Sequence, residues 1–63
     1  MMSYLTGKVK YHKMNVHIYL NNPVGIGEHP DIMAAIEEEL EKAASYQEKL
    51  EMLGEILMGG DNG

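Results

Sequence analysis

Few residues of this chain could do chemistry, and some of them surround a Gly-Ile-Gly stretch at 25–27. This stretch precedes a predicted helix start at Pro30, and the free backbone N–H groups of a helix N-terminus attract anions. It has neither the G-x-G-x-x-G pattern nor the Lys-Ser/Thr pair of a P-loop, and Glu28 and Asp31 would repel an anion. We therefore interpret the stretch as a structural loop and predict no cofactor.

Three histidines, His12, His17 and His29, are the next candidates. A zinc site needs three or four converging ligands, and the chain has no cysteine to supplement them. His12 and His17 would lie on opposite faces of a strand unless a bulge intervenes. Capping of the predicted helix would account for His29 without a metal ion. The sequence therefore predicts no metal site.

The sequence shows no nucleophile with a base that could activate it. The only serines are Ser3 and Ser45, one near the N-terminus and one within the predicted helix, and neither has a readable base. The many glutamates of the helix read as a solvated surface, and a 63-residue chain has little room for a pocket. We predict that the protein is not an enzyme and has no catalytic residue.

The element that would position any site is a helix over residues 30–58. Pro30 suits the first helical position and Asp31 places negative charge in the first turn. Gly59 and Gly60 follow the last apolar residue, where a left-handed cap is easily formed by glycine. Such a helix is about 43 Å long at about 1.5 Å per residue, too long for the rest of the chain to cover.

Apolar residues recur along this helix with a heptad period. Ile36, Ala43, Leu50 and Leu57 are seven residues apart, and Ile32, Tyr46 and Leu53 take the companion positions. Glu39 breaks the companion series, and Leu40 beside it carries the apolar stripe. We predict self-association, with a dimer favoured, through Ile36, Leu40, Ala43, Tyr46, Leu50, Leu53 and Leu57. The alternative is a helix packed only on the strands of its own chain.

The preceding residues, 8–20, alternate between apolar and polar side chains in the pattern of a strand. Val16, Ile18 and Leu20 alternate with polar neighbours, and the parity changes near His12, which indicates one bulged strand or a hairpin. The predicted fold is therefore α+β in a single domain, 1–63. Its parts are a strand or hairpin over 8–20, a loop over 21–29, the helix over 30–58 and a disordered tail over 59–63.

Charge is divided unevenly along the chain. Residues 1–27 carry three lysines and no acid, a charge of +3, while residues 28–63 carry ten acids and two lysines, a charge of −8, which gives the total of −5. An acidic chain is a poor candidate for nucleic-acid binding. The alternative function is a ribbon-helix-helix type DNA-binding regulator, in which Lys8, Lys10 and Lys13 of a paired strand contact nucleic acid.

Membrane association is not indicated. No segment approaches the roughly 18 apolar residues of a membrane span, and the N-terminus lacks the apolar core of a signal peptide. The polar face of the predicted helix is acidic and would be repelled by an anionic membrane surface. We expect a cytoplasmic protein.

One stretch has a likeness elsewhere. The run Asn22-Pro23-Val24-Gly25-Ile26-Gly27-Glu28-His29-Pro30-Asp31, followed by an acidic amphipathic helix, resembles small uncharacterised proteins of marine bacteriophages, especially those that infect cyanobacteria. The resemblance covers residues 15 to 55 and carries over no functional residue. It implies a small phage or marine-environment protein without assigned activity, which would lie in the host cytoplasm if it comes from a phage. Together with the heptad pattern of the predicted helix, the resemblance favours a small oligomeric protein that acts in protein-protein interaction or as an accessory protein.

Overall fold

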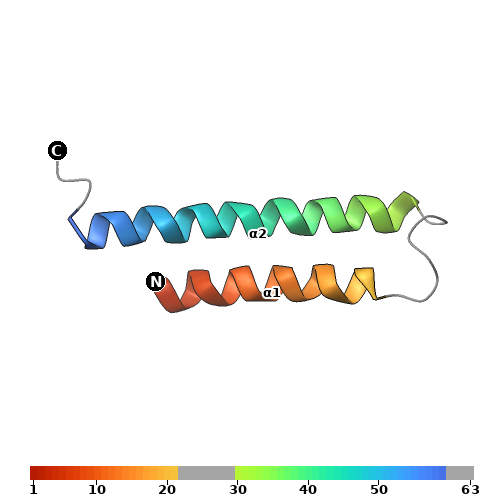
Figure 1. Cartoon of the computed structure of the whole chain (residues 1–63), viewed down its shortest axis with the longest axis horizontal. Helices are drawn as coiled ribbons and strands as arrows, with labels where there is room; N and C mark the ends of the chain where they lie inside the picture. The colour runs from red at the N-terminus through yellow and green to blue at the C-terminus, as the bar shows by residue number, and fades with distance from the viewer. Residues whose placement is uncertain (22–29, 60–63) are drawn as a thin grey trace.

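The computed structural model describes residues 1–21 and 30–59, and these form two helices (Figure 1). Helix α1 spans Met2–Leu20 and helix α2 spans Pro30–Leu57. The helices lie side by side and run in opposite directions, so the described part of the chain is a helical hairpin. Residues 22–29 of the loop predicted over 21–29, and residues 60–63 of the tail predicted over 59–63, lie outside the described residues.

Helix α2 begins and ends at the signals in its sequence. It starts at Pro30 with Asp31 in the first turn, and it ends one residue before the predicted limit. Gly59 has a φ of +76°, in the left-handed region that favours glycine, and its N–H donates to the carbonyl of Ile56 at 3.0 Å. This cap satisfies one of the carbonyls that the last helical turn leaves without a partner.

The α+β prediction is wrong, because residues 8–20 belong to helix α1 rather than to a strand or hairpin. The same helix includes the residues before them, from Met2 onward. Leu5, Val9, His12, Val16 and Tyr19 are spaced by four and three residues, and all of them are buried or half-buried in α1. The apolar–polar alternation near residue 18 is local, whereas this helical stripe runs through the whole element and finds a partner surface on α2.

The stripe was hidden because the outer side of α1 is also apolar. Tyr4, Tyr11, Met14 and Ile18 are exposed, while the inner stripe includes the polar His12. A helix with apolar residues on most sides shows little amphipathic contrast. The ribbon-helix-helix alternative loses its structural basis with this correction, since that fold needs a strand and the described residues contain none.

The core of the hairpin is thin. Leu5, Val9 and Ala43 are buried apolar residues, and no side chain in the described ranges is fully buried. The Cα trace measures 50 × 19 × 11 Å, with a radius of gyration of 15.2 Å, against about 11 Å for a globular chain of this length. The hairpin is thus a single layer of helices, whereas stable domains pack at least two layers around a core.

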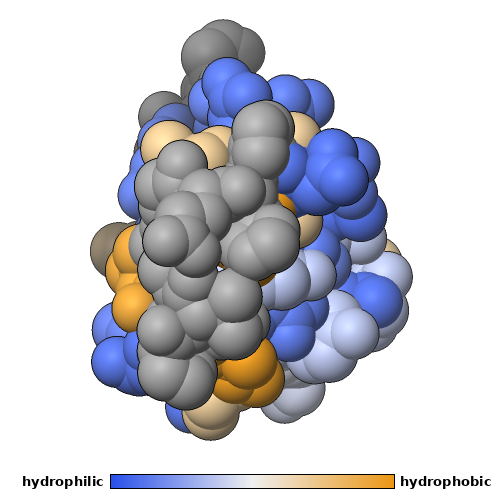
Figure 2. Space-filling view, turned by 90° about the vertical axis from the view of Figure 1, so that its right-hand side faces the viewer, coloured by the Kyte–Doolittle hydropathy of each residue, from blue (hydrophilic) through white to orange (hydrophobic). Residues whose placement is uncertain are grey.

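Hydrophobic side chains therefore reach the surface. Viewed from the end nearest the loop, hydrophilic residues cover much of the α2 side, and hydrophobic residues emerge on one flank and along the α1 side (Figure 2). Met33, Leu40 and Ile18 are each more than half exposed. The single-layer hairpin leaves apolar surface that its own chain does not cover within the described residues.

Candidate functional site

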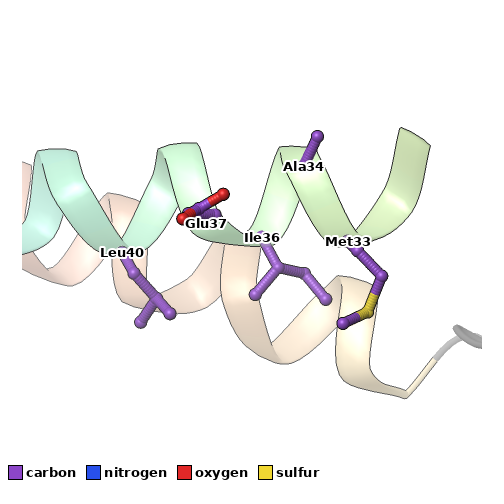
Figure 3. A pocket seen from close by; sticks show the side chains of 5 residues that line it. All are labelled: Met33, Ala34, Ile36, Glu37 and Leu40. Carbon is purple, nitrogen blue, oxygen red and sulfur yellow. The ribbon is translucent and has the colours of Figure 1, made fainter. Parts of the chain in front are cut away.

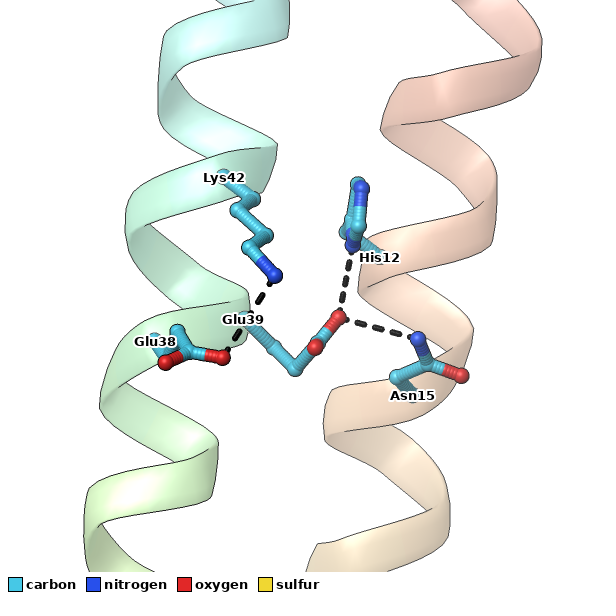
Figure 4. A network of polar contacts seen from close by, with 5 residues as sticks. All are labelled: His12, Asn15, Glu38, Glu39 and Lys42. Carbon is cyan, nitrogen blue, oxygen red and sulfur yellow. Dashed lines mark hydrogen bonds and ion pairs between the residues drawn. The ribbon is translucent and has the colours of Figure 1, made fainter.

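A polar bridge joins the two helices near the middle of α1 (Figure 4). Glu39 of α2 reaches across to α1, where its Oε1 lies 2.6 Å from Nδ1 of His12. The same oxygen accepts a hydrogen bond from Nδ2 of Asn15 at 2.9 Å. His12 is a buried polar residue, and the side chain of Glu39 is only 14% exposed. We call His12, Asn15 and Glu39 the polar bridge.

The bridge favours the ionised form of Glu39. The Asn15 amide and the His12 ring both donate hydrogen bonds to its carboxylate and hold the pKa of Glu39 below the ordinary glutamate value of 4.5, although partial burial opposes them. Because a carboxylate only accepts, Nδ1 of His12 must carry a proton in this contact. The ring therefore enters the bridge as the Nδ1–H tautomer or as imidazolium.

Aromatic rings continue the contact toward the start of α1. The ring of Tyr46 stacks on that of His12, with centroids 5.7 Å apart and planes inclined by 6°. Tyr4 meets Tyr46 edge-on at 6.4 Å. The ammonium groups of Lys8 and Lys49 lie 5.9 Å and 4.9 Å from the centre of the Tyr46 ring, within cation–π distance.

The polar bridge is suited to fixing the register of the helices rather than to catalysis. A slip of α1 along α2 would leave His12 and Glu39 partly buried without their partners, which is costly for polar groups. A single polar pair in an apolar seam is a well-attested way to specify register. Neither serine contacts the bridge, and within 1–21 and 30–59 no group of three or more potential ligands could hold a metal ion.

The polar bridge was not predicted because residues 8–20 were expected to form a strand, whereas they belong to α1. In the sequence, Glu39 breaks the heptad series, and the predicted strand includes His12. The break was itself the signal, since a carboxylate at a seam position needs a donor on the facing helix. His12 and Asn15 are three residues apart, which places both on the same side of a helix.

The predicted oligomer-interface residues fall into two groups. Ala43 is buried and Ile36, Tyr46, Leu50 and Leu53 are half-buried, on the side of α2 that faces α1 or continues that side. Leu40 and Leu57 are 53% and 64% exposed. The seam therefore serves first to join the two helices of one chain, and an interface between chains through these residues stays a prediction.

The three lysines proposed for nucleic-acid contact are not brought together. Lys8 is half-buried beside the tyrosines, with its ammonium 5.7 Å from the Tyr4 ring centre. Lys10 and Lys13 are exposed on other sides of α1. A ribbon that would present all three to a DNA groove is absent from the described chain.

A shallow depression lies on one flank of α2 (Figure 3). Its lining is mainly apolar, and Met33, Ile36 and Leu40 point the same way, with Glu37 at the rim. Ala34 completes the lining. The depression holds no cluster of polar groups that would select a small ligand, so it reads as an open apolar surface.

Helix α2 also extends beyond α1. Because His12 contacts Glu39 and Tyr4 contacts Tyr46, Met2 lies about level with Lys49. The segment 50–57 therefore projects past the first residue of α1, as the blue end of α2 shows (Figure 1). Ile56 and Leu57 are exposed on this projection.

Two further observations bear on the class of protein. Neither of the two described helices is long and apolar enough to cross a membrane. Comparisons with protein-family models, with curated proteins and with solved structures find no match to this chain. A functional conclusion must therefore be drawn from the hairpin itself.

Proposed function

We propose that this protein is a small interaction module that folds as a homo-oligomer, with the dimer as the favoured state. The observation that carries the proposal is the single layer of two helices without a fully buried side chain. Chains of this size need a staple, and disulfides are excluded because the chain has no cysteine. Association of two hairpins supplies the second layer.

The composition of the exposed surface supports the same proposal. Met33 and Leu40 are more than half exposed and line one apolar depression, and exposed apolar surface of this kind marks interaction sites in soluble proteins. The projecting end of α2 adds Ile56 and Leu57. Interaction with a further protein, as an accessory factor, would use whatever surface the assembly leaves open.

Thermal unfolding at several protein concentrations tests this proposal. If folding and association are coupled, a 100-fold increase in concentration should raise the midpoint by on the order of 10 °C. The helical signal should disappear at high dilution. A midpoint that stays constant from 1 µM to 100 µM, roughly the range in which such modules associate, would show that the hairpin folds alone and would contradict the proposal.

A further inference from the structure

We infer that two copies of this chain pair through one particular flank of the hairpin, with α1 of each copy lying on α2 of the other; the inference rests on the proposed function. We call a residue inner when it faces the other helix of the hairpin. The flank consists of residues that directly follow an inner residue in the sequence, on each helix. They are Lys13 and Leu20 on α1, and Met33, Glu37 and Leu40 on α2. We call this set the pairing flank.

The two sides of the hairpin differ in what already covers them. Lys8 and Lys49 both lie beside Tyr46, so cation–π contacts occupy part of the side formed by residues that directly precede an inner residue, although Ile18 on that side is 61% exposed. The pairing flank lies on the opposite side. There Leu20, Met33 and Leu40 are 53%, 55% and 53% exposed. Met33 and Leu40 also line the depression of Figure 3, together with Ile36.

Charge identifies the occupant as a second copy. Helix α1 carries three lysines and no acid, and α2 carries eight acids and two lysines, so their side-chain charges are +3 and −6 with histidines neutral. Among the described residues the only ion pairs are His12–Glu39 and Lys42–Glu38. Lys10, Lys13, Glu37 and Glu41 thus form no ion pair within 1–21 and 30–59, and we place them against the second copy.

Charge also selects between the two ways in which identical flanks can meet. A two-fold axis across the helices would place α1 on α1 and α2 on α2, so like charges would face each other. A two-fold axis along the helices places each α1 on the partner's α2, and the two run antiparallel. Since His12 is level with Glu39, Lys10 and Lys13 would then lie level with the Glu37–Glu41 turn of the other copy.

The position of the interface is tested by charging it on one flank only. Leu40→Glu places a carboxylate in the centre of the pairing flank, and Ile18→Glu is the matched control, because Ile18 is 61% exposed on the opposite flank. Sedimentation equilibrium should show the dimer dissociation constant of Leu40→Glu raised by roughly 100-fold or more, since a carboxylate would be buried without a partner. The control should stay within a few fold of the parent chain.

The arrangement is tested by exchanging charges. Lys10→Glu with Lys13→Glu, and separately Glu37→Lys with Glu41→Lys, should each weaken self-association by roughly 10-fold or more, and mixing the two variants should restore it. The second variant reduces the net charge from −5 to −1, so general repulsion alone would predict stronger association. Weaker self-association of this variant would therefore show that the specific lysine–glutamate pairs form.

The outcomes distinguish a failure of the pairing flank from a failure of homo-oligomerisation. A parent chain that is monomeric at 100 µM, a concentration at which even a micromolar complex would form, overturns both. A dimeric parent whose association is unaffected by Leu40→Glu or disrupted by Ile18→Glu overturns the pairing flank and leaves the oligomer intact. If Leu40→Glu unfolds, the charge exchange decides alone: recovery on mixing supports the arrangement, and undiminished association of both variants contradicts it.

Discussion

At the scale of single residues, the hairpin depends on a few polar contacts across an apolar seam. Glu39 occupies a position that faces α1, and it is tolerated there because His12 and Asn15 donate to the same carboxylate oxygen. Removing one member leaves the others partly buried without a partner, so the bridge acts as a unit. Lys42 and Glu38, by contrast, form an exposed pair at 3.4 Å that contributes little.

The depressed pKa of Glu39 makes a definite prediction about acid. Between its folded pKa and the ordinary value of 4.5, the unfolded chain binds more protons, so stability rises with pH in that window. The contribution of the bridge should be complete above about pH 4.5 and should be lost as the pH falls through the folded pKa. In urea unfolding at fixed protein concentration, Glu39→Gln should be less stable than the parent at neutral pH, and the difference should shrink in acid.

Asn15→Ala provides the companion measurement. The Asn15 amide makes the largest contribution to lowering the pKa of Glu39, so its removal should move the acid loss to higher pH, nearer 4.5. A Glu39→Gln difference that keeps the same size across the acid range would show that the bridge does not favour the carboxylate.

At the scale of elements, three glycines distinguish helix interior from helix end. A Cβ at Gly7 in α1 or at Gly54 in α2 would have no neighbour within 4 Å, and both are helical. Gly7→Ala and Gly54→Ala should each raise the free energy of unfolding by about 1 kcal/mol, because glycine loses more backbone entropy in a helix. Denaturant midpoints at a fixed protein concentration measure this.

Gly59→Ala is the control for this pair. Its Cβ would also meet nothing within 4 Å, but Gly59 has a φ of +76°. Alanine in the left-handed region costs about 1–2 kcal/mol, so this variant should lose stability. A gain at Gly59 equal to that at Gly7 would contradict the cap at the end of α2.

The two helices differ in how far the sequence could predict them. For α2, the start at Pro30, the heptad spacing and the glycine cap all agree, and its limits could be read to within one residue. For α1, the inner stripe contains His12 and the outer side contains Tyr11 and Ile18, so composition gives no contrast between faces. Its helical state is decided by packing on α2, which local patterns do not contain. The polar bridge joins side chains of both helices, so it cannot be predicted unless both helices are predicted.

At the scale of the whole molecule, charge and shape lead to the same arrangement. The net charge of α1 is positive and that of α2 is negative, so the helices attract each other within one chain, and the proposed dimer would bring unlike helices of two copies together. One hairpin is a single layer with apolar residues exposed on both flat sides. In the proposed dimer, two hairpins placed with unlike helices together would form a four-helix arrangement with an enclosed core.

Sedimentation equilibrium of the unmodified chain tests the central claim most directly. The protomer mass is 7.1 kDa, and the account predicts twice that mass for folded protein at micromolar concentration and above, with mass and helical content falling together on dilution. The mass does not depend on any assumption about which flank pairs. A folded, helical species that keeps a mass of 7.1 kDa over the same range would contradict the account.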